Sequence, residues 1–322
     1  MIILLTGAAG FIGFHAARTL LAQGHSVIGV DSLNDYYDIG LKRARLTELD
    51  AHKNFECHIL DIGDENALAS FQGRGITHIL HLAAQAGVRH SIDNPRVYGR
   101  SNFMGYLEVL EFARHCDSLE HLVYASSSSV YGERELGNES AGFSENDVVR
   151  TPSSLYAATK LGGEMLAQSY ASLYKIPQTG LRFFTVYGPW GRPDMAYFLF
   201  TQKILAGQPI TLYAPDIMQR DFTYIDDISA VLPRILDTPP AAHTLYNLGN
   251  SSPSPLMGLV SAVEKACGKK AELDIAPKQK GDVTHTFADI SAAKAAFGFE
   301  PKTDLETGIA EFVAWYRGYY GD

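Results

Sequence analysis

The chain has 322 residues, of which 46% are hydrophobic and 20% are charged, and its formal net charge at pH 7 is -9. This length is enough for one large domain or two closely joined domains with a substantial core. Acidic and basic residues are spread along the chain, which excludes a protein that binds nucleic acid through clustered Lys and Arg.

Short aliphatic runs alternate with longer helical patterns over residues 1–185. The expected strands are IILLTG (2–7), SVIGVD (26–31), FECHIL (55–60), ITHILHLA (76–83), HLVYAS (121–126) and QTGLRFF (178–184). Continuous apolar strands separated by helices are typical of a parallel sheet covered on both faces. The sequence therefore predicts an α/β fold, with a Rossmann-type doubly wound parallel sheet over residues 1–185.

The rest of the chain has shorter and less regular patterns. It contains the Gly/Pro-rich stretch TVYGPWGRPDMA (185–196), the strand-like pieces RDFTYIDDI (220–228) and TLYNLGN (244–250), and an amphipathic helix over 305–320. We expect residues 221–250 to return to the Rossmann domain. Residues 186–220 and 251–322 are then expected to form a smaller, interleaved substrate-binding domain, with the ligand in the cleft between the two.

The cysteines and histidines give no sign of a metal site. Cys57, Cys116 and Cys267 lie far apart and are odd in number, which favours a reducing cytoplasm over a disulfide framework. His78 and His81 fall on a predicted strand, where we expect histidines of the core. No stretch reaches the roughly 20 uninterrupted apolar residues of a membrane span, so neither a metal nor a membrane is expected.

The first strand runs directly into TGAAGFIG, which places Gly7, Gly10 and Gly13 three residues apart. Glycines at these positions allow a tight turn, a close approach of a pyrophosphate and the packing of the next helix, whose first amides attract phosphate. Asp31 ends the second strand, where a carboxylate accepts hydrogen bonds from ribose hydroxyls and repels a 2′-phosphate. The pattern therefore favours NAD over NADP, and Asp61, after the third strand, is a candidate adenine contact.

The fifth strand ends in four serines (126–129), and SLYAATK follows on a predicted helix. Tyr156 and Lys160 are four residues apart, so they share one face of that helix. A tyrosine with its ordinary pKa of about 10 is a poor base at neutral pH. We expect the Lys160 ammonium and a nicotinamide cation to lower that pKa toward the working range.

These motifs in this order resemble the extended short-chain dehydrogenase/reductase family, the NAD-dependent epimerases and dehydratases, over essentially the whole chain. More narrowly, the chain is similar to the UDP-glucuronate 4-epimerases. The stretches that carry this resemblance are LNDYYD (33–38), HLAAQAGVRHS (81–91), ASSSSVYG (125–132), SLYAATK (154–160), LRFFTVYGPWGRPDMA (181–196) and RDFTYIDDI (220–228). The chain departs from the family pattern at Ile2 and at His90, where Lys or Arg and Tyr are usual.

The resemblance implies a catalytic triad of Ser127, Tyr156 and Lys160. Ser128 and Ser129 stand where related dehydratases have acids, and a serine is no strong general acid at neutral pH. The expected reaction is therefore the reversible C4 epimerisation of UDP-glucuronic acid to UDP-galacturonic acid through a 4-keto sugar, an isomerase reaction with tightly bound, recycled NAD. The expected NAD contacts are Gly7, Gly10, Phe11, Ile12, Gly13, Asp31, Asp61, Ile62, Ala83, Tyr156 and Lys160.

A 4-keto hexuronate is a β-keto acid and loses CO₂ when its carboxylate bond aligns with the ketone. We expect Ser128, Ser129 and Thr185 to hold the carboxylate out of that alignment, with Arg192 adding a charge-assisted pair. By resemblance Arg220 goes with the diphosphate, whereas Arg89 is a candidate for either anion without an assignment. Asn102 either orients the site or is an ordinary amide on a helix surface.

Three other functions remain open from the sequence. A UDP-glucose/UDP-galactose 4-epimerase would keep the triad but would not need Arg192, and a UDP-glucuronate decarboxylase is disfavoured by serine in place of an acid. A non-catalytic NAD-dependent sensor would have no reason to keep the triad together. By resemblance the protein is expected to be a cytoplasmic homodimer, joined through helices spanning about 95–115 and 153–174.

Overall fold

A computed structural model describes residues 1–133, 142–279 and 281–321. In the described chain, a parallel sheet of seven strands has the order β10-β6-β5-β4-β1-β2-β3. Its strands are β1 (Ile2–Thr6), β2 (Ser26–Asp31), β3 (Phe55–Ile59), β4 (His78–His81), β5 (His121–Ser127), β6 (Gln178–Phe183) and β10 (His243–Leu248). This confirms the predicted Rossmann-type α/β fold.

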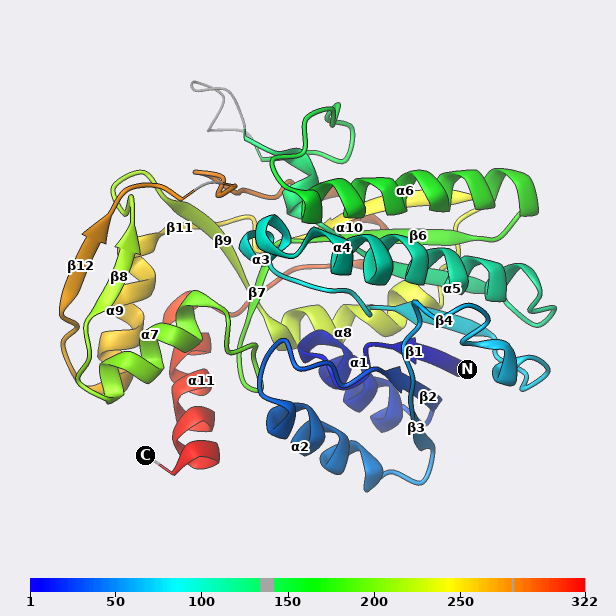
Figure 1. Cartoon of the computed structure of the whole chain (residues 1–322), viewed down its shortest axis with the longest axis horizontal. Helices are drawn as coiled ribbons and strands as arrows, with labels where there is room; N and C mark the ends of the chain where they lie inside the picture. Colours follow the sequence, from blue (N-terminus) through cyan, green and yellow to red (C-terminus); the bar gives the residue numbers. More distant parts are fainter. Residues whose placement is uncertain (134–141, 280, 322) are drawn as a thin grey trace.

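Helices cover both faces of this sheet, as Figure 1 shows. One face carries α1 (Phe11–Ala22), α2 (Ile39–Asp50) and α8 (Ile225–Leu236). The other carries α5 (Gly105–Arg114) and α6 (Leu155–Tyr174). Shorter pieces connect them, namely η1 (Ala69–Phe71), α3 (Val88–Asp93), α4 (Pro95–Tyr98), η2 (Gly99–Met104) and η3 (Ser128–Tyr131). Because both faces are covered, most residues of the central strands β1, β4, β5 and β6 are buried.

Two small sheets lie beside the carboxyl ends of the central strands. They contain β7 (Thr185–Tyr187), β9 (Gln219–Tyr224) and β11 (Pro253–Pro255), and separately β8 (Ile210–Tyr213) and β12 (Leu273–Ala276). The helices around them are α7 (Ala196–Leu205), α9 (Leu256–Cys267), α10 (Ser291–Phe297) and α11 (Leu305–Tyr320). In the described parts of the chain, no helix is both long and apolar enough to cross a membrane.

The chain passes back and forth between the two regions. Residues 221–224 pair with β7 and β11 in the small sheet, so this part of the expected 221–250 return does not join the large sheet. Helix α8 packs against α1, and β10 pairs with β6. We propose on this topology that residues 1–185 and 225–250 form one domain and that 186–224 and 251–322 form the smaller one.

A serine cap sets where the helix that carries Tyr156 and Lys160 begins. Ser154 precedes α6 with extended backbone, and its side-chain oxygen accepts a hydrogen bond from the amide of Ala157 at 3.1 Å. A serine in this position satisfies one of the free amides of the first turn. The cap therefore places Tyr156 in the first turn and Lys160 one turn later, facing the end of β5.

Two buried histidines make the stability of the fold depend on pH. His121 has hydrogen-bond partners on both ring nitrogens, Leu236 O and Thr179 Oγ1, each at 2.9 Å. His81 lies in the core of β4, and its Nδ1 lies 2.8 Å from Thr6 Oγ1. Burial lowers the pKa of His81 to about 3 and that of His121 to about 4.

The pH dependence has a definite sign. Between pH 6.5 and the lowered native pKa, the unfolded chain binds a proton that native His81 does not, so acidification favours unfolding. Between pH 7 and pH 5, the free energy of unfolding of the wild type is expected to fall by about 2 kcal/mol more than that of a His81→Gln variant. Urea denaturation at both pH values measures this difference. An equal fall in the free energy of unfolding for the two proteins would contradict it.

Candidate functional site

A cavity of about 890 Å³ opens at the carboxyl ends of the central strands. Parallel α/β sheets bind their ligands at this edge, because the loops that follow the strands meet there. Its walls come from the loops after β1, β2, β4 and β5, from the start of α6, and from the small sheets. All the site residues expected from the sequence line it, namely Gly7, Gly10, Phe11, Ile12, Gly13, Asp31, Asp61, Ile62, Ala83, Ser127, Ser128, Ser129, Tyr156, Lys160, Thr185, Arg89, Arg192 and Arg220.

The glycine turn leaves room and free amides for a pyrophosphate. Gly7 has φ +78°, and a Cβ there would lie 2.8 Å from the amide nitrogen of Ala83. A Cβ on Gly13 would lie 2.0 Å from the carbonyl oxygen of Gly7, so only glycine lets α1 pack this closely. Among the residues that the structure describes, no side chain caps the start of α1 at Gly10. The first amides of the helix are therefore available to an anion, which fits a dinucleotide.

Two carboxylates line the cofactor end of the cavity. Asp31 accepts hydrogen bonds from the amides of Ala9 at 3.0 Å and Leu33 at 2.9 Å, so it also fixes the two adjacent loops. Each of its oxygens keeps a further lone pair for a ribose hydroxyl. Asp61 accepts from the amide of Gly63 at 2.9 Å and forms an ion pair with Arg100 at 3.2 Å. These two carboxylate acceptors and the space beside them therefore suit NAD.

The three expected catalytic residues meet at the end of β5. The Lys160 ammonium donates to the carbonyl oxygen of Ala125 at 2.9 Å, which ties α6 to that strand. Ser127 Oγ accepts from the amide of Ser129 at 3.2 Å and from its hydroxyl at 2.9 Å. Tyr156 interacts with Ser127 through its hydroxyl. A base, a hydroxyl donor and an ammonium thus share one wall of the cavity.

The ionisation of Tyr156 differs from the sequence expectation. Burial raises its pKa, while the hydrogen bond with Ser127 and the charge of Arg192 act in the opposite direction. The Lys160 ammonium itself donates to the carbonyl oxygen of Ala125 at 2.9 Å. Burial also lowers the pKa of Lys160 to about 8. In the protein alone, burial outweighs the effects of Ser127 and Arg192, so the pKa of Tyr156 lies above its ordinary value.

The three arginines of the cavity differ in their partners. Arg89 forms a 2.9 Å ion pair with Asp282 and lies over the ring of Tyr213, so an anion would compete with that carboxylate. Arg220 donates to the carbonyl oxygens of Gln219 at 2.9 Å and Thr284 at 3.1 Å. Burial lowers the pKa of Arg220, although the charges of Asp282 and Glu133 act in the opposite direction. A guanidinium that donates to backbone carbonyls keeps further N–H groups for a phosphate.

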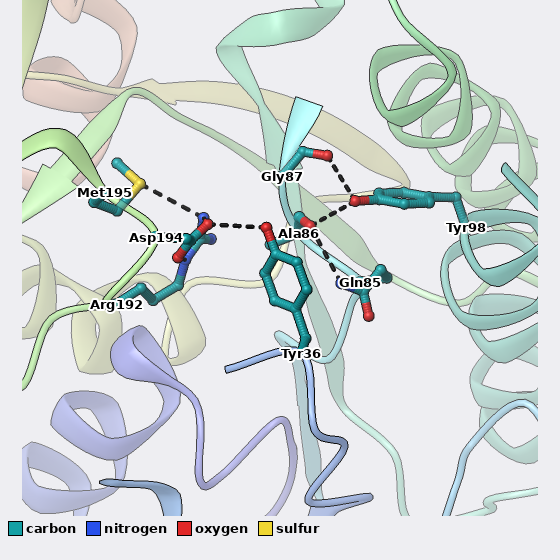
Figure 2. Close-up of polar contacts among 8 residues, drawn as sticks. All are labelled: Tyr36, Gln85, Ala86, Gly87, Tyr98, Arg192, Asp194 and Met195. Atoms are coloured by element: carbon teal, nitrogen blue, oxygen red, sulfur yellow. Dashed lines mark hydrogen bonds and ion pairs between the residues drawn. The ribbon is translucent and has the colours of Figure 1, made fainter. Parts of the chain in front are cut away.

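Arg192 is paired with a carboxylate of its own chain. Its Nε and Nη2 lie 3.0 and 2.8 Å from the two oxygens of Asp194 (Figure 2). The pair lowers the pKa of Asp194 and raises that of Arg192. The sequence predicts a ligand carboxylate as the partner of Arg192 and gives no role to Asp194, although the aspartate lies only two residues away.

Asn102 is buried, so its reading as a surface amide is wrong. Its Oδ1 accepts from the amide of Gln85 at 2.7 Å, and its Nδ2 donates to the carbonyl of Gln85 and to Thr159 Oγ1, both at 3.1 Å. The side chain therefore ties the loop after β4 to α6. Tyr98 supports the same loop by donating to the carbonyls of Ala86 and Gly87 at 2.6 Å (Figure 2).

Glu164 is a further residue of this region that was not expected from the sequence. It follows Lys160 by four positions on α6 and forms a buried, two-point ion pair with Arg182 of β6 at 2.9 and 2.7 Å. The charge of Glu164 acts to raise the pKa of Lys160 against the effect of burial. The spacing Tyr156, Lys160, Glu164 on one helix face was the available signal.

Comparisons with known proteins agree with this geometry. The family model of the NAD dependent epimerase/dehydratase family matches residues 3–249. The chain is 45% identical to UDP-glucuronate 4-epimerase 1 of Arabidopsis thaliana over 99% of this chain and 77% of the relative, and 45% identical to Protein CapI of Staphylococcus aureus over 99% of both. It is 32% identical to the crystal structure of UDP-glucuronic acid 4-epimerase from Bacillus cereus in complex with UDP-glucuronic acid and NAD, with a TM-score of 0.92 over 99% of this chain and 100% of the other.

Proposed function

This chain belongs to the NAD dependent epimerase/dehydratase family, and on that premise we propose that it is a UDP-glucuronate 4-epimerase. The reaction is the reversible, NAD-dependent epimerisation of UDP-glucuronic acid at C4, which gives UDP-galacturonic acid. One observation carries the proposal: Ser127, Tyr156 and Lys160 share a cavity wall in which the next two side chains are serines, not acids. The site can therefore move a proton at C4 but lacks the acid that elimination needs.

The residues of this chain divide the work at C4 between them. NAD, when bound, supplies the hydride acceptor and donor for C4 of the sugar. Tyr156 as phenolate accepts the O4 proton and returns it to the same oxygen after the 4-keto sugar has presented its other face. Ser127 orients O4 toward Tyr156, and Lys160 and Arg192 favour the phenolate. The net oxidation state does not change, so the cofactor is recycled in place and stays tightly bound.

The substrate residues act on the two charged ends of the nucleotide sugar. Arg220 binds the diphosphate, and Arg89 borders the same anion. Ser128, Ser129, Thr185 and Arg192 hold the hexuronate carboxylate away from the alignment that releases CO₂. The support for this proposal is that all of these side chains line one cavity with Tyr156.

Neither enzymatic alternative is favoured. A neutral-sugar 4-epimerase would leave Arg192 without a ligand carboxylate, and a decarboxylase would want a proton donor where Ser128 and Ser129 stand. Relatives similar over the whole chain carry the name UDP-glucuronate 4-epimerase. A protein that only senses NAD would not need the triad.

The test is to incubate the purified protein with UDP-glucuronic acid, without added NAD, and to follow the products by proton NMR. UDP-galacturonic acid as the sole product is the expected result, and it requires cofactor retained through purification. A parallel sample with added NAD separates loss of cofactor from lack of activity. Conversion of UDP-glucose to UDP-galactose with UDP-glucuronic acid untouched would contradict the carboxylate assignment, and a UDP-pentose would contradict the protective role of the serines.

The assembly and location are further parts of the proposal. A cytoplasmic location is supported by the cysteines, which are odd in number and far apart in the sequence. A homodimer is supported by apolar side chains exposed on η2 and α6, among them Phe103, Met165 and Leu173. Figure 1 shows α5 and α6 side by side on one face of the sheet, where two copies would form a four-helix contact. Sedimentation analysis of the wild type and of Leu173→Asp measures this, and a wild-type monomer would contradict it.

A further inference from the structure

The loop between β7 and α7 carries Arg192, and Asp194 of the same loop occupies one edge of its guanidinium. The contact is side-on: Nε lies 3.0 Å from Asp194 Oδ1 and Nη2 lies 2.8 Å from Oδ2 (Figure 2). Nη2 also lies 3.5 Å from Met195 Sδ. Among the residues that the structure describes, Nη1 has no hydrogen-bond partner. A ligand carboxylate that reaches Arg192 with Asp194 in place therefore meets the Nη1 end of the fork.

Tyr36, from the loop after β2, fixes Asp194 in turn. Its hydroxyl donates to Asp194 Oδ2 at 3.1 Å (Figure 2). The tyrosine fits closely over Gly87, since a Cβ at that glycine would lie 2.4 Å from the Tyr36 hydroxyl oxygen. The rings of His90 and Tyr36 pack together, with their centroids 4.8 Å apart. Burial raises the pKa of Tyr36 to about 12, so the hydroxyl remains a donor at neutral pH.

Arg45 of α2 holds the same loop at a second point. This arginine is fully buried, and its Nη2 donates to the carbonyl oxygens of Trp190 at 2.6 Å and Gly191 at 3.2 Å. Its Nη1 donates to the carbonyl oxygen of Ala9, in the glycine turn, at 2.8 Å. The loop with Arg192 is thus attached directly to the part of the chain that receives the cofactor.

We propose that Asp194 and Tyr36 are positioning residues that set the specificity of the site for a hexuronate. Asp194 turns the guanidinium of Arg192 so that its Nη1 end receives the sugar carboxylate, and Tyr36 holds Asp194 in that orientation. The proposal rests on the proposed function, because it assigns a role in holding the carboxylate of that substrate. This role explains why an acidic residue lies beside an anion site. Asp194 lowers the attraction of the site for carboxylates in general, and it fixes the geometry of Arg192 for the hexuronate carboxylate.

The test uses the holoenzyme and the variants Asp194→Asn and Tyr36→Phe. In Asp194→Asn the Nε and Nη2 edge is released and the charge of Arg192 is uncompensated, so UDP-glucuronic acid still binds but in the wrong orientation. A displacement of this kind lowers the rate of the bound complex by about tenfold or more. We expect kcat to fall by this amount with KM not raised. Tyr36→Phe keeps the ion pair, so its kcat should fall about threefold.

Calorimetric binding of UDP-glucose, which lacks the carboxylate, separates positioning from a general loss of the loop. Its Kd should stay within twofold of wild type in both variants, and the exposed Asp117→Asn serves as the matched control for the charge change. A fall in kcat of less than threefold for Asp194→Asn, a raised KM, or weaker binding of UDP-glucose overturns the proposal. If the wild type itself does not epimerise UDP-glucuronic acid, the proposed function fails instead, and the two failures are thereby distinguished.

Discussion

Replacing Tyr156 by phenylalanine is expected to lower kcat for the 4-epimerisation of UDP-glucuronic acid about a thousand-fold, within the range for loss of a general acid–base. Tyr156 is the phenol that Ser127 and the charge of Arg192 act on. Its ring stays in place in the variant, because the edge-on packing against Tyr98, with centroids 6.2 Å apart, does not need the hydroxyl. Initial rates by proton NMR at saturating substrate measure the effect.

The control for this variant is binding. Bound NAD, measured by its absorbance, and the Kd for UDP-glucuronic acid should both stay within threefold of wild type, since only the proton-transfer group has been removed. Tyr320→Phe, an exposed tyrosine of the last helix, should leave kcat unchanged. A Tyr156→Phe enzyme with kcat within tenfold of wild type would show that another group moves the O4 proton.

Replacing Glu164 by glutamine is expected to lower the free energy of unfolding by about 3 kcal/mol or more. Glu164 and Arg182 form a two-point pair with almost no exposed surface, and Ser126 Oγ donates to the same carboxylate at 2.5 Å. The variant leaves the Arg182 cation buried without its carboxylate partner. The guanidinium carbon still lies 4.7 Å from the centroid of the Tyr131 ring, whose face attracts a cation only weakly by comparison. Urea denaturation at pH 7 and fixed NAD concentration measures the loss.

An exposed pair provides the contrast. Lys265 and Glu306 lie 2.5 Å apart, with about two thirds or more of each side chain exposed, so Glu306→Gln should lower the free energy of unfolding far less than Glu164→Gln does. The double variant Glu164→Leu, Arg182→Met removes both buried charges and should be more stable than Glu164→Gln. Equal losses for Glu164→Gln and Glu306→Gln would show that burial does not decide the value of the ion pair here.

Much of the fold could be predicted because its signals are local. The six predicted strands of the first half coincide with strands of the large sheet, and the last predicted helix, over 305–320, is α11. Apolar runs, glycine turns and helical periods depend on residues a few positions apart, and both faces of the sheet demand the same kind of side chain. The position of β9 was harder to predict, since a short strand between two domains carries no signal for which sheet it joins.

The residues of the site could be predicted, but the hydrogen bonds between them could not. The glycine turn, Asp31, Ser127, Tyr156 and Lys160 belong to motifs in which spacing implies chemistry, and all of them line the cavity. Their hydrogen bonds did not follow from spacing. Lys160 shares a helix face with Tyr156, yet its ammonium donates to the Ala125 carbonyl of the strand beside the helix.

The sequence by itself determined the order of strands and helices, the cofactor turn and the catalytic set, because each depends on neighbours along the chain. Only the tertiary structure decided which distant residues hold that set in place. Tyr36 reaches Asp194 across 158 positions, and Arg45 reaches Trp190 across 145. Such contacts form where crossover connections bring the carboxyl ends of parallel strands and the loops of the smaller domain to one place, and no local period in the sequence records that meeting.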